Sequence, residues 1–280
     1  MTSQHQLGFF DPALLPAPKP PRMARRLSVL ITVKAAPNPS STYGETVCVA
    51  GISTDLAEPG WVRLYPINFR DLSSDGQFQK YDLIEVDANP ATADPRTESW
   101  KPIMTTMTRK AHLPPWAKRR ALVDPYVETS MCAINAGSLL PGSRSLAAIQ
   151  VADVSDLVVT PHPGWSQAEQ AKIDSYVNQL DLFGSNDRTA LEAPRFRGKY
   201  HWRCADRACK GHEQRLLDWE FVALQRNLYG RSDDETKASL RQRFLDEICG
   251  SGKDLAFYVG NQAKRHNVFS VLGVYYPRAR

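Results

Sequence analysis

Several features are scarce or missing in this sequence of 280 residues. No apolar run is long enough to span a bilayer, and the N-terminus lacks a charged start followed by an apolar core, so we expect a cytoplasmic protein. There are only five cysteines, an odd number spread along the chain, which argues against a disulfide framework and for reduced thiols.

Common catalytic signatures are missing as well. The sequence contains no glycine-rich phosphate loop ending in Lys-Ser or Lys-Thr, no dinucleotide fingerprint, no Gly-any-Ser-any-Gly elbow and no zinc-protease helix. These absences disfavour the usual nucleotide and hydrolase chemistries. A cysteine or serine nucleophile stays open, because the members of a triad need not be close in sequence.

The composition is that of a folded protein with an uneven charge. Hydrophobic residues make up 42% and charged residues 23%, as in ordinary globular proteins, and the length allows one large or two medium domains. The net charge of +5 hides a gradient: residues 35–194 carry 13 basic and 19 acidic side chains, whereas residues 195–280 carry 17 basic and 10 acidic ones. The basic end suggests a surface that faces a polyanion, DNA or RNA.

The chain divides into three segments by composition. Residues 1–24 include "FDPALLPAPKPPR", where proline favours extended conformations, and we expect a flexible arm that is a solvated tail or a docking segment for a protein partner. Residues 25–184 read as a β-rich domain with helical insertions, and residues 185–280 as an α+β domain. The predicted fold class is therefore α+β, with a barrel-like N-terminal domain.

Four short runs in the N-terminal domain predict strands: residues 27–35, 45–52, 60–67 and 81–88. In "GWVRLYPI", alternation puts Trp61, Arg63 and Tyr65 on one face. Aromatic and cationic groups together can stack bases and hold phosphates. The alternative is a sheet face covered by other segments of the chain.

The later part alternates strands and helices. We expect two strand-like runs within residues 145–161, a helix over residues 165–184, a strand over 195–204, a helix over 212–229, a helix over 233–249 capped by Ser232, and strands over 254–262 and 268–277.

A candidate metal site lies in the turn after residue 203. Cys204, Cys209 and His212 span a loop short enough to wrap one zinc ion, and His201 is a possible fourth ligand if the strand has ended before it. The alternative is a metal-free turn with a histidine that caps a helix. The other cysteines, Cys48, Cys132 and Cys249, have apolar surroundings and are expected to be small core residues.

The predicted helix after His212 places Glu220 within an apolar stripe. A carboxylate there needs a partner: a metal, a substrate proton, or a cation such as Lys199, Arg203 or Lys264; an arginine pair that ties the helix to the sheet is the alternative. For Asp218, a local salt bridge on the helix is sufficient.

The segment "KDLAFYVGNQAKRHN" resembles the variant metal-dependent nuclease motif of the Mrr-like restriction endonucleases. The resemblance implies that Asp254, Gln262 and Lys264 hold Mg²⁺ and the attacking water, with Glu220 as a helper. Only seven residues separate Asp254 from Gln262, and Gly260 with Asn261 signals a turn, so a basic β-hairpin is the alternative.

The markers "C, four residues, C, two residues, H", "LDWE", "FYVGN" and "FSVLGVYYP" together resemble those of an uncharacterised bacterial family, which implies a cytoplasmic bacterial protein and no particular activity.

Taken together, the residues predict a nucleic-acid-binding protein, in defence or nucleic-acid processing, with a metal-stabilised basic C-terminal domain. The residues expected to contact phosphate are Arg195, Arg197, Lys199, Arg203, Lys264 and Arg265. The residues expected to stack on bases are Trp61, Tyr65, Tyr200 and Trp202. A metal-dependent nuclease and a protein-interaction subunit of a larger complex are the alternative functions.

Overall fold

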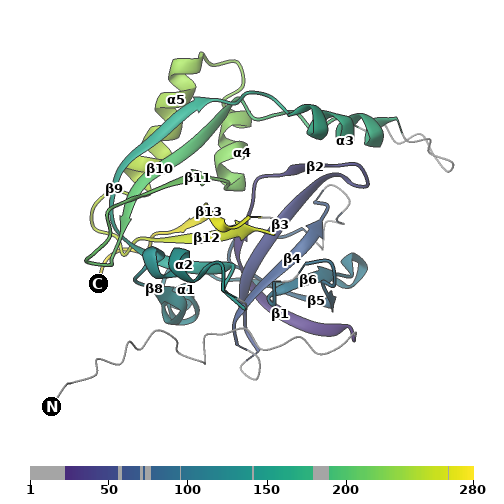
Figure 1. The fold of residues 1–280 in the computed structure, drawn as a ribbon, viewed down its shortest axis with the longest axis horizontal. Coiled ribbons are helices and arrows are strands. Elements are labelled where there is room, and N and C mark those ends of the chain that lie inside the picture. Colours follow the sequence, from purple (N-terminus) through teal and green to yellow (C-terminus); the bar gives the residue numbers. More distant parts are fainter. Residues whose placement is uncertain are drawn as a thin grey trace.

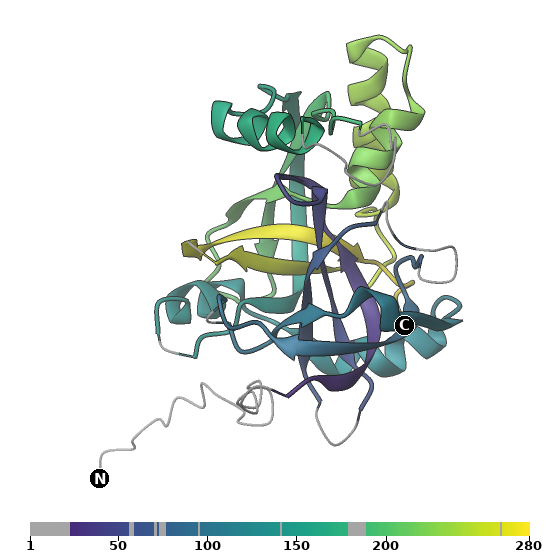
Figure 2. The ribbon, with the colours of Figure 1, turned by 90° about the vertical axis from the view of Figure 1, so that its right-hand side faces the viewer.

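The computed structural model describes residues 23–55, 59–69, 72, 77–94, 96–140, 142–178, 189–263 and 265–280 (Figure 1). The predicted arm falls outside this range, apart from Met23 and Ala24. The protein is α+β, as predicted, and consists of two barrel-like sheets with helices at their ends (Figures 1 and 2).

The first sheet contains all four strands predicted for the N-terminal domain. Its hydrogen-bonded order is β1 (Arg25–Lys34), β3 (Gly44–Ser53), β4 (Trp61–Ile67), β6 (Ser99–Pro102), β5 (Asp82–Pro90) and β7 (Thr108–His112), and β2 (Asn38–Ser40) pairs with β3. Because β1 pairs with both β3 and β5, a closed barrel results, formed by β1, β3, β4, β6 and β5 in this order.

Alternation along β1 shows how this barrel is packed. Val29 and Ile31 point into the barrel, whereas Leu30 points outward into a second cluster that also contains Tyr258 of the other sheet. An irregularity in the strand register between Ile31 and Val33 brings Val33 to this outer cluster as well. Both faces of the strand are therefore buried, which explains why residues 29–33 are apolar except for Thr32. The two sheets pack against each other through this outer cluster.

The second sheet takes strands from both sides of the predicted boundary at residue 184. Its order is β10 (Phe196–Cys204), β11 (His212–Leu216), β13 (Arg265–Tyr275), β12 (Ala256–Gln262), β9 (Leu146–Pro161) and β8 (Val127–Glu128). β10 also pairs with β9, which closes a second barrel-like sheet. The two runs expected within 145–161 form the single long strand β9.

The helices lie at the two ends of the second sheet, except α3 (Gln167–Val177), which packs beside β2 and β3 of the first sheet (Figure 1). The others are α1 (Ala117–Val123), α2 (Met131–Gly137), α4 (Trp219–Asn227) and α5 (Asp233–Arg241), which continues as a π-helical turn (Gln242–Glu247); short 3₁₀ turns occupy Met104–Thr106 and Asp124–Tyr126. In Figure 1, α4 and α5 lie above the sheet, and α1 and α2 lie below it. Among the described residues, no helix has the length and apolar character required to cross a membrane.

One helix begins later than predicted. Residues His212–Leu216 form β11, with Gln214 and Leu216 buried and their neighbours more exposed, a period of two rather than of 3.6. α4 starts only at Trp219, where the side chain of Asp218 accepts the backbone N–H of Glu220 as an N-cap. The predicted cap of α5 is confirmed, because Ser232 and Glu235 form a capping box.

Candidate metal centre and charged surfaces

Three thiols and one imidazole converge where β10 turns into β11. Their donor atoms all lie within 4.8 Å of one another and belong to Cys132, Cys204, Cys209 and His212, here called the cysteine–histidine cluster. The sulfur of Cys132 is 4.0 Å from that of Cys204 and 3.6 Å from Nε2 of His212. The sulfur of Cys209 is 3.2 Å from the same nitrogen. A disulfide needs about 2.0 Å between sulfurs, so these thiols are free.

The spacing of the cluster suits a tetrahedral metal site. With Zn–S bonds of about 2.3 Å and Zn–N bonds of about 2.0 Å, the donors of a zinc tetrahedron lie roughly 3.5–3.8 Å apart. Three cysteines and one histidine are a usual donor set for structural zinc. The cluster could therefore bind a metal such as zinc.

Each donor comes from a different place in the chain. Cys132 lies in the first turn of α2, Cys204 is the last residue of β10, and His212 is the first residue of β11. Cys209 lies in the turn between the two strands, where Gly211 has a φ of +112°. Glycine adopts this positive φ without steric cost, so the chain reverses direction between Cys209 and His212.

Asp206 organises this turn. Its carboxylate accepts a hydrogen bond from the hydroxyl of Ser130 at 2.6 Å and from the backbone N–H of Ala208 at 2.9 Å. The backbone N–H of Cys209 donates to the carbonyl of Asp206 at 3.0 Å. Because Ser130 is also the N-cap of α2, these bonds hold the helix that carries Cys132 against the turn.

Burial changes the protonation of the donors. It raises the pKa of the Cys132 thiol to about 12, an effect that the neighbouring Cys204 thiol strengthens, and it lowers the pKa of the His212 imidazole. Burial by itself would raise the pKa of Cys204 as well. Hydrogen bonds to its sulfur, including those from the backbone at Asp206 and Cys132, together outweigh burial, so the pKa of Cys204 lies below its ordinary value. A bound cation would favour the thiolate form of the cysteines, because it supplies the positive charge that these four side chains lack.

The fourth donor is Cys132 and not the predicted His201. β10 continues to Cys204, so the side chains of His201 and Cys204 point to opposite faces of the strand. The imidazole of His201 instead faces Glu213 at 3.8 Å. The assignment of Cys132 to the core alone is corrected here: it lies 72 residues before Cys204, too far for a local motif to connect them.

The predicted nuclease residues do not converge. Asp254 lies before β12 and pairs with Arg120 at 2.6 Å, whereas Gln262 is the last residue of β12 and is exposed. Eight residues of nearly extended chain place them roughly 26 Å apart. Lys264 lies outside the described residues. A magnesium site that uses both Asp254 and Gln262 is therefore excluded by the course of β12.

Glu220 belongs to a different charged cluster. The ammonium of Lys80 is 2.6 Å from the carboxylate of Asp218 and 3.3 Å from that of Glu220. The side chain of Asp218 is only 1% exposed, whereas that of Glu220 is 51% exposed. The prediction of a buried Glu220 is wrong, because α4 begins at Trp219 and the apolar stripe projected from His212 does not exist.

Lys34 completes this group, which we call the lysine–carboxylate cluster: Lys34, Lys80, Asp218 and Glu220. The ammonium of Lys34 donates to the carbonyl of Phe78 at 3.1 Å and lies 3.9 Å from the centre of the Phe69 ring. Lys34 and Lys80 come from the first sheet and its loops, and the two acids come from the start of α4. The cluster therefore joins the two halves of the protein.

Burial dominates the titration of this cluster. It raises the pKa of Asp218 to about 6 against the effect of Lys80, and it lowers the pKa of Lys34 to about 8. Burial also disfavours the charged form of Lys80, but the charges of Asp218 and Glu220 and the hydrogen bond to Asp218 together outweigh burial and raise the pKa of Lys80 above its ordinary value.

Basic side chains share the outer face of β10 and β11. Along β10 the buried residues alternate with more exposed ones, which include Arg197, Lys199 and Arg203. The antiparallel register places Arg215 of β11 opposite Lys199. We call Arg197, Lys199, Arg203 and Arg215 the cationic strip. The sequence pattern thus brings three of the predicted phosphate contacts together.

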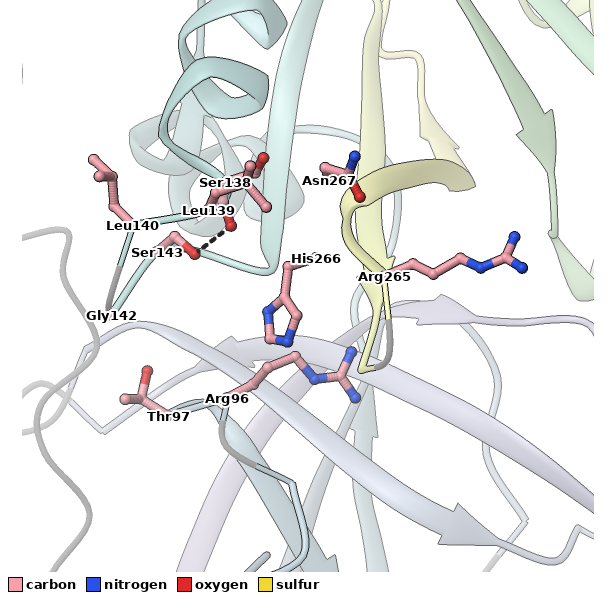
Figure 3. Close-up of a pocket in the computed structure, with 10 residues that line it drawn as sticks. All are labelled: Arg96, Thr97, Ser138, Leu139, Leu140, Gly142, Ser143, Arg265, His266 and Asn267. Atoms are coloured by element: carbon pink, nitrogen blue, oxygen red, sulfur yellow. Dashed lines mark hydrogen bonds between the residues drawn. The ribbon is translucent and has the colours of Figure 1, made fainter.

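The other two predicted phosphate contacts in the described chain lie elsewhere. Arg195 pairs with Asp233 at 2.6 Å at the start of α5. Arg265 lies in the β12–β13 hairpin, which together with residues 96–97, 138–140 and 142–143 lines a pocket of about 500 Å³. Figure 3 shows the imidazole of His266 in this pocket above the Arg96 side chain, with Arg265 extending away from both. Arg96 is held by Asp94 at 2.6 Å.

Three of the four aromatic residues predicted to stack on bases are core residues. Tyr200 is 0%, Trp202 2% and Trp61 8% exposed, so their rings have no free face for a base. Alternation explains this for β10, where the aromatic residues occupy the inward positions between the basic ones. Only Tyr65 is exposed, at 46%, and it lies on β4 of the first sheet.

Comparison with known families and proteins gave two family matches. The model of the family described as Domain of unknown function (DUF8757) matches residues 127–280, and that of Domain of unknown function (DUF8758) matches residues 25–125. The first match covers the second sheet and all four donors of the cysteine–histidine cluster. The comparison with curated proteins gave no match.

Proposed function

The chain belongs to the family described as Domain of unknown function (DUF8757), and we propose that it binds nucleic acid through the cationic strip while zinc in the cysteine–histidine cluster stabilises the strands that carry the strip. The observation that carries this proposal is the strip itself. Its four basic side chains share one face of two neighbouring strands, and a basic surface of this kind contacts phosphates without selecting sequence.

The pairing of nearby acids supports the proposal. Glu213 lies on the same face but pairs with Lys199 at 2.5 Å, and Asp156 of β9 pairs with Arg241 at 2.7 Å. Among the described residues, no carboxylate lies within salt-bridge distance of the guanidinium groups at positions 197, 203 and 215. Arg203 lies opposite Asp153 of β9 in the strand register, and Arg197 donates a hydrogen bond to the hydroxyl of Thr160 at 3.2 Å, but each of the three guanidinium groups keeps donors that can contact a polyanion.

The position of the cysteine–histidine cluster supports a structural role for the metal. Cys204 ends β10 and His212 begins β11, so a metal bound to both would fix the connection between the two strands of the strip. Four protein donors fill a tetrahedral zinc site and leave no position for a substrate, which is typical of structural rather than catalytic zinc.

A binding experiment tests the proposal. The affinity of the full chain for labelled DNA and RNA of about 20 nucleotides is measured at about 50 and 200 mM salt. We expect affinity to fall steeply with salt, and the double variant Arg197→Ala with Arg215→Ala to weaken binding and to reduce the slope of log affinity against log salt by roughly 1.4 for a single strand.

The matched control removes the same charge elsewhere. Arg109 and Lys110 lie on the exposed edge strand β7 of the first sheet, and the double variant Arg109→Ala with Lys110→Ala should leave binding within about twofold of the wild type. The proposal fails if the wild type does not bind, or if the two double variants weaken binding equally.

A further inference from the structure

We propose that the groove at the end of the cationic strip holds a single unstacked base, so that the natural ligand is a single strand rather than a duplex. This inference rests on the proposed function. The groove has a volume of about 410 Å³ and lies between residues 36–38 of the first sheet, the β9–α3 connection with the first turn of α3, the start of β10, the end of β11, and α4.

The floor of the groove is apolar and preformed. It consists of Phe196, Leu216, Phe221 and Val222, each no more than 6% exposed. Gly198 also lines it, and a Cβ at that position would come within 3.1 Å of the Phe221 ring, so the close approach depends on glycine. The flat face of a base can cover an apolar floor of this kind, whereas a phosphate would lose its hydration there.

One wall of the groove is aromatic. The half-buried ring of Trp165 packs edge-on against the imidazole of His162, with 5.6 Å between the ring centres. The indole N–H of Trp165 donates to the carbonyl of Leu191 at 2.8 Å, which fixes the ring. A held aromatic ring beside an apolar floor is the arrangement on which single-stranded nucleic acids stack their bases.

The rim of the groove is cationic and continuous with the strip, because Arg197 and Arg215 belong to both. Their charges lie close enough to His162 to lower its pKa, in addition to the larger effect of burial. Glu169 is the acidic residue that lines the groove, and its carboxylate is engaged by the backbone N–H and the hydroxyl of Ser166 at 2.8 and 2.6 Å. The phosphates of a strand can therefore follow the strip while one base enters the groove.

A duplex does not fit this arrangement without disruption. Its bases are paired and stacked inside, and turning one outward costs a few kcal/mol, whereas the bases of a single strand are accessible. The combination of a cationic strip and a recessed aromatic groove thus favours a single strand.

The test compares three labelled probes of the same length: a single strand, a duplex, and a strand of abasic deoxyribose phosphates. We expect Trp165→Ala to weaken binding of the single strand by about 5- to 150-fold, as at other base-stacking sites, and to leave the duplex, the abasic strand and the salt slope unchanged. Trp165→Phe should keep most of the affinity. As a matched control, Tyr229→Ala removes an aromatic side chain that is 90% exposed outside the groove, and no change is expected.

The outcomes separate the two proposals. If Trp165→Phe and Trp165→Ala, both with wild-type thermal unfolding, bind the single strand as the wild type does while Arg197→Ala with Arg215→Ala does not, the groove inference is wrong and the proposed function stands. If Trp165→Ala weakens all three probes equally, the groove inference is also wrong. If the wild type binds none of the probes, both proposals fail.

Discussion

The protein joins distant parts of its chain by two clusters of opposite kind. The cysteine–histidine cluster brings together α2, β10 and β11 through four side chains that could bind a metal, and a bound metal would add to the stability of this junction. The lysine–carboxylate cluster brings together the first sheet and α4, and it contains both signs of charge. We therefore expect the stability contributed by the cysteine–histidine cluster to change with metal supply. We expect the stability contributed by the lysine–carboxylate cluster to change with pH, with salt and with the loss of one charged partner.

Within the second cluster, the two ion pairs of Lys80 differ in exposure. Its pair with Asp218 is almost fully excluded from water, whereas Glu220 is half exposed. A buried charge that loses its partner is strongly destabilising, whereas an exposed pair contributes little. Loss of the metal should therefore destabilise the protein most, and loss of the exposed pair least.

Removal of the metal should have the largest effect. We expect purified protein to contain about one zinc per chain, and Cys209→Ser to lose it, because a tetrahedral site needs all four donors. Structural zinc binds with about 10–16 kcal/mol in small zinc-dependent domains, so a chelator or Cys209→Ser should lower the midpoint of thermal unfolding by many degrees. Elemental analysis and calorimetry measure the two effects.

Cys48→Ser is the matched control for this prediction. Cys48 lies on β3, outside the cysteine–histidine cluster, and its substitution should leave the metal content unchanged. A wild type without metal, or equal loss of metal in the two variants, would show that the cluster is not a metal site.

Breaking the buried ion pair should have the next largest effect. Lys80→Met leaves the carboxylate of Asp218 buried without its cation, and we expect a loss of about 3–5 kcal/mol in the free energy of unfolding. Urea unfolding measures this loss. Adding Asp218→Asn should recover most of it, because asparagine is uncharged and still caps α4. A double variant as unstable as Lys80→Met would contradict this account of the pair.

Local patterns were sufficient to predict much of the fold. The barrel strands and the capping box of Ser232 follow from short runs of β-branched residues and from a cap three residues before an acid. The same local reasoning failed at His212–Leu216. A mixture of apolar and polar side chains over only five residues fits both the helical period of 3.6 and the strand period of two, and the pairing with β10 makes this segment a strand.

The parts of the candidate sites that depend on distant residues could not be predicted. Cys132 reaches the cluster only because α2 packs against the turn after β10, and Lys80 reaches Asp218 across 138 residues. Three of the donors, Cys204, Cys209 and His212, were predicted from their spacing alone. Long-range contacts of this kind are set by the packing of whole elements, and no sequence motif records them.

Lys34 should make stability depend on pH. Burial lowers its pKa from 10.5 to about 8, so between these two values the folded state binds fewer protons than the unfolded state. The stability of the wild type should therefore rise with pH through this window, and the cost of burying the charge is fully present below pH 8. We expect the free energy of unfolding of the wild type to rise relative to that of Lys34→Met by about 3 kcal/mol from pH 7 to pH 10.5.

Chemical unfolding at several pH values measures this difference. Lys110→Met is the matched control, since its side chain is 50% exposed on β7, and its effect on stability should not change across the same window. If the difference in the free energy of unfolding between Lys34→Met and the wild type is constant from pH 7 to pH 10.5, folding does not lower the pKa of Lys34 and this account is wrong.

Glu220→Gln should have the smallest effect. The carboxylate of Glu220 is 3.3 Å from Lys80 but 51% exposed, so water and salt screen the pair, and we expect a loss of at most about 1 kcal/mol in the free energy of unfolding. The loss should shrink further at about 1 M salt, whereas the loss in Lys80→Met should persist because the buried pair is screened much less. A loss in Glu220→Gln as large as that in Lys80→Met would mean that the two acids share the charge of Lys80 equally, and the contrast between a buried and an exposed pair would no longer hold.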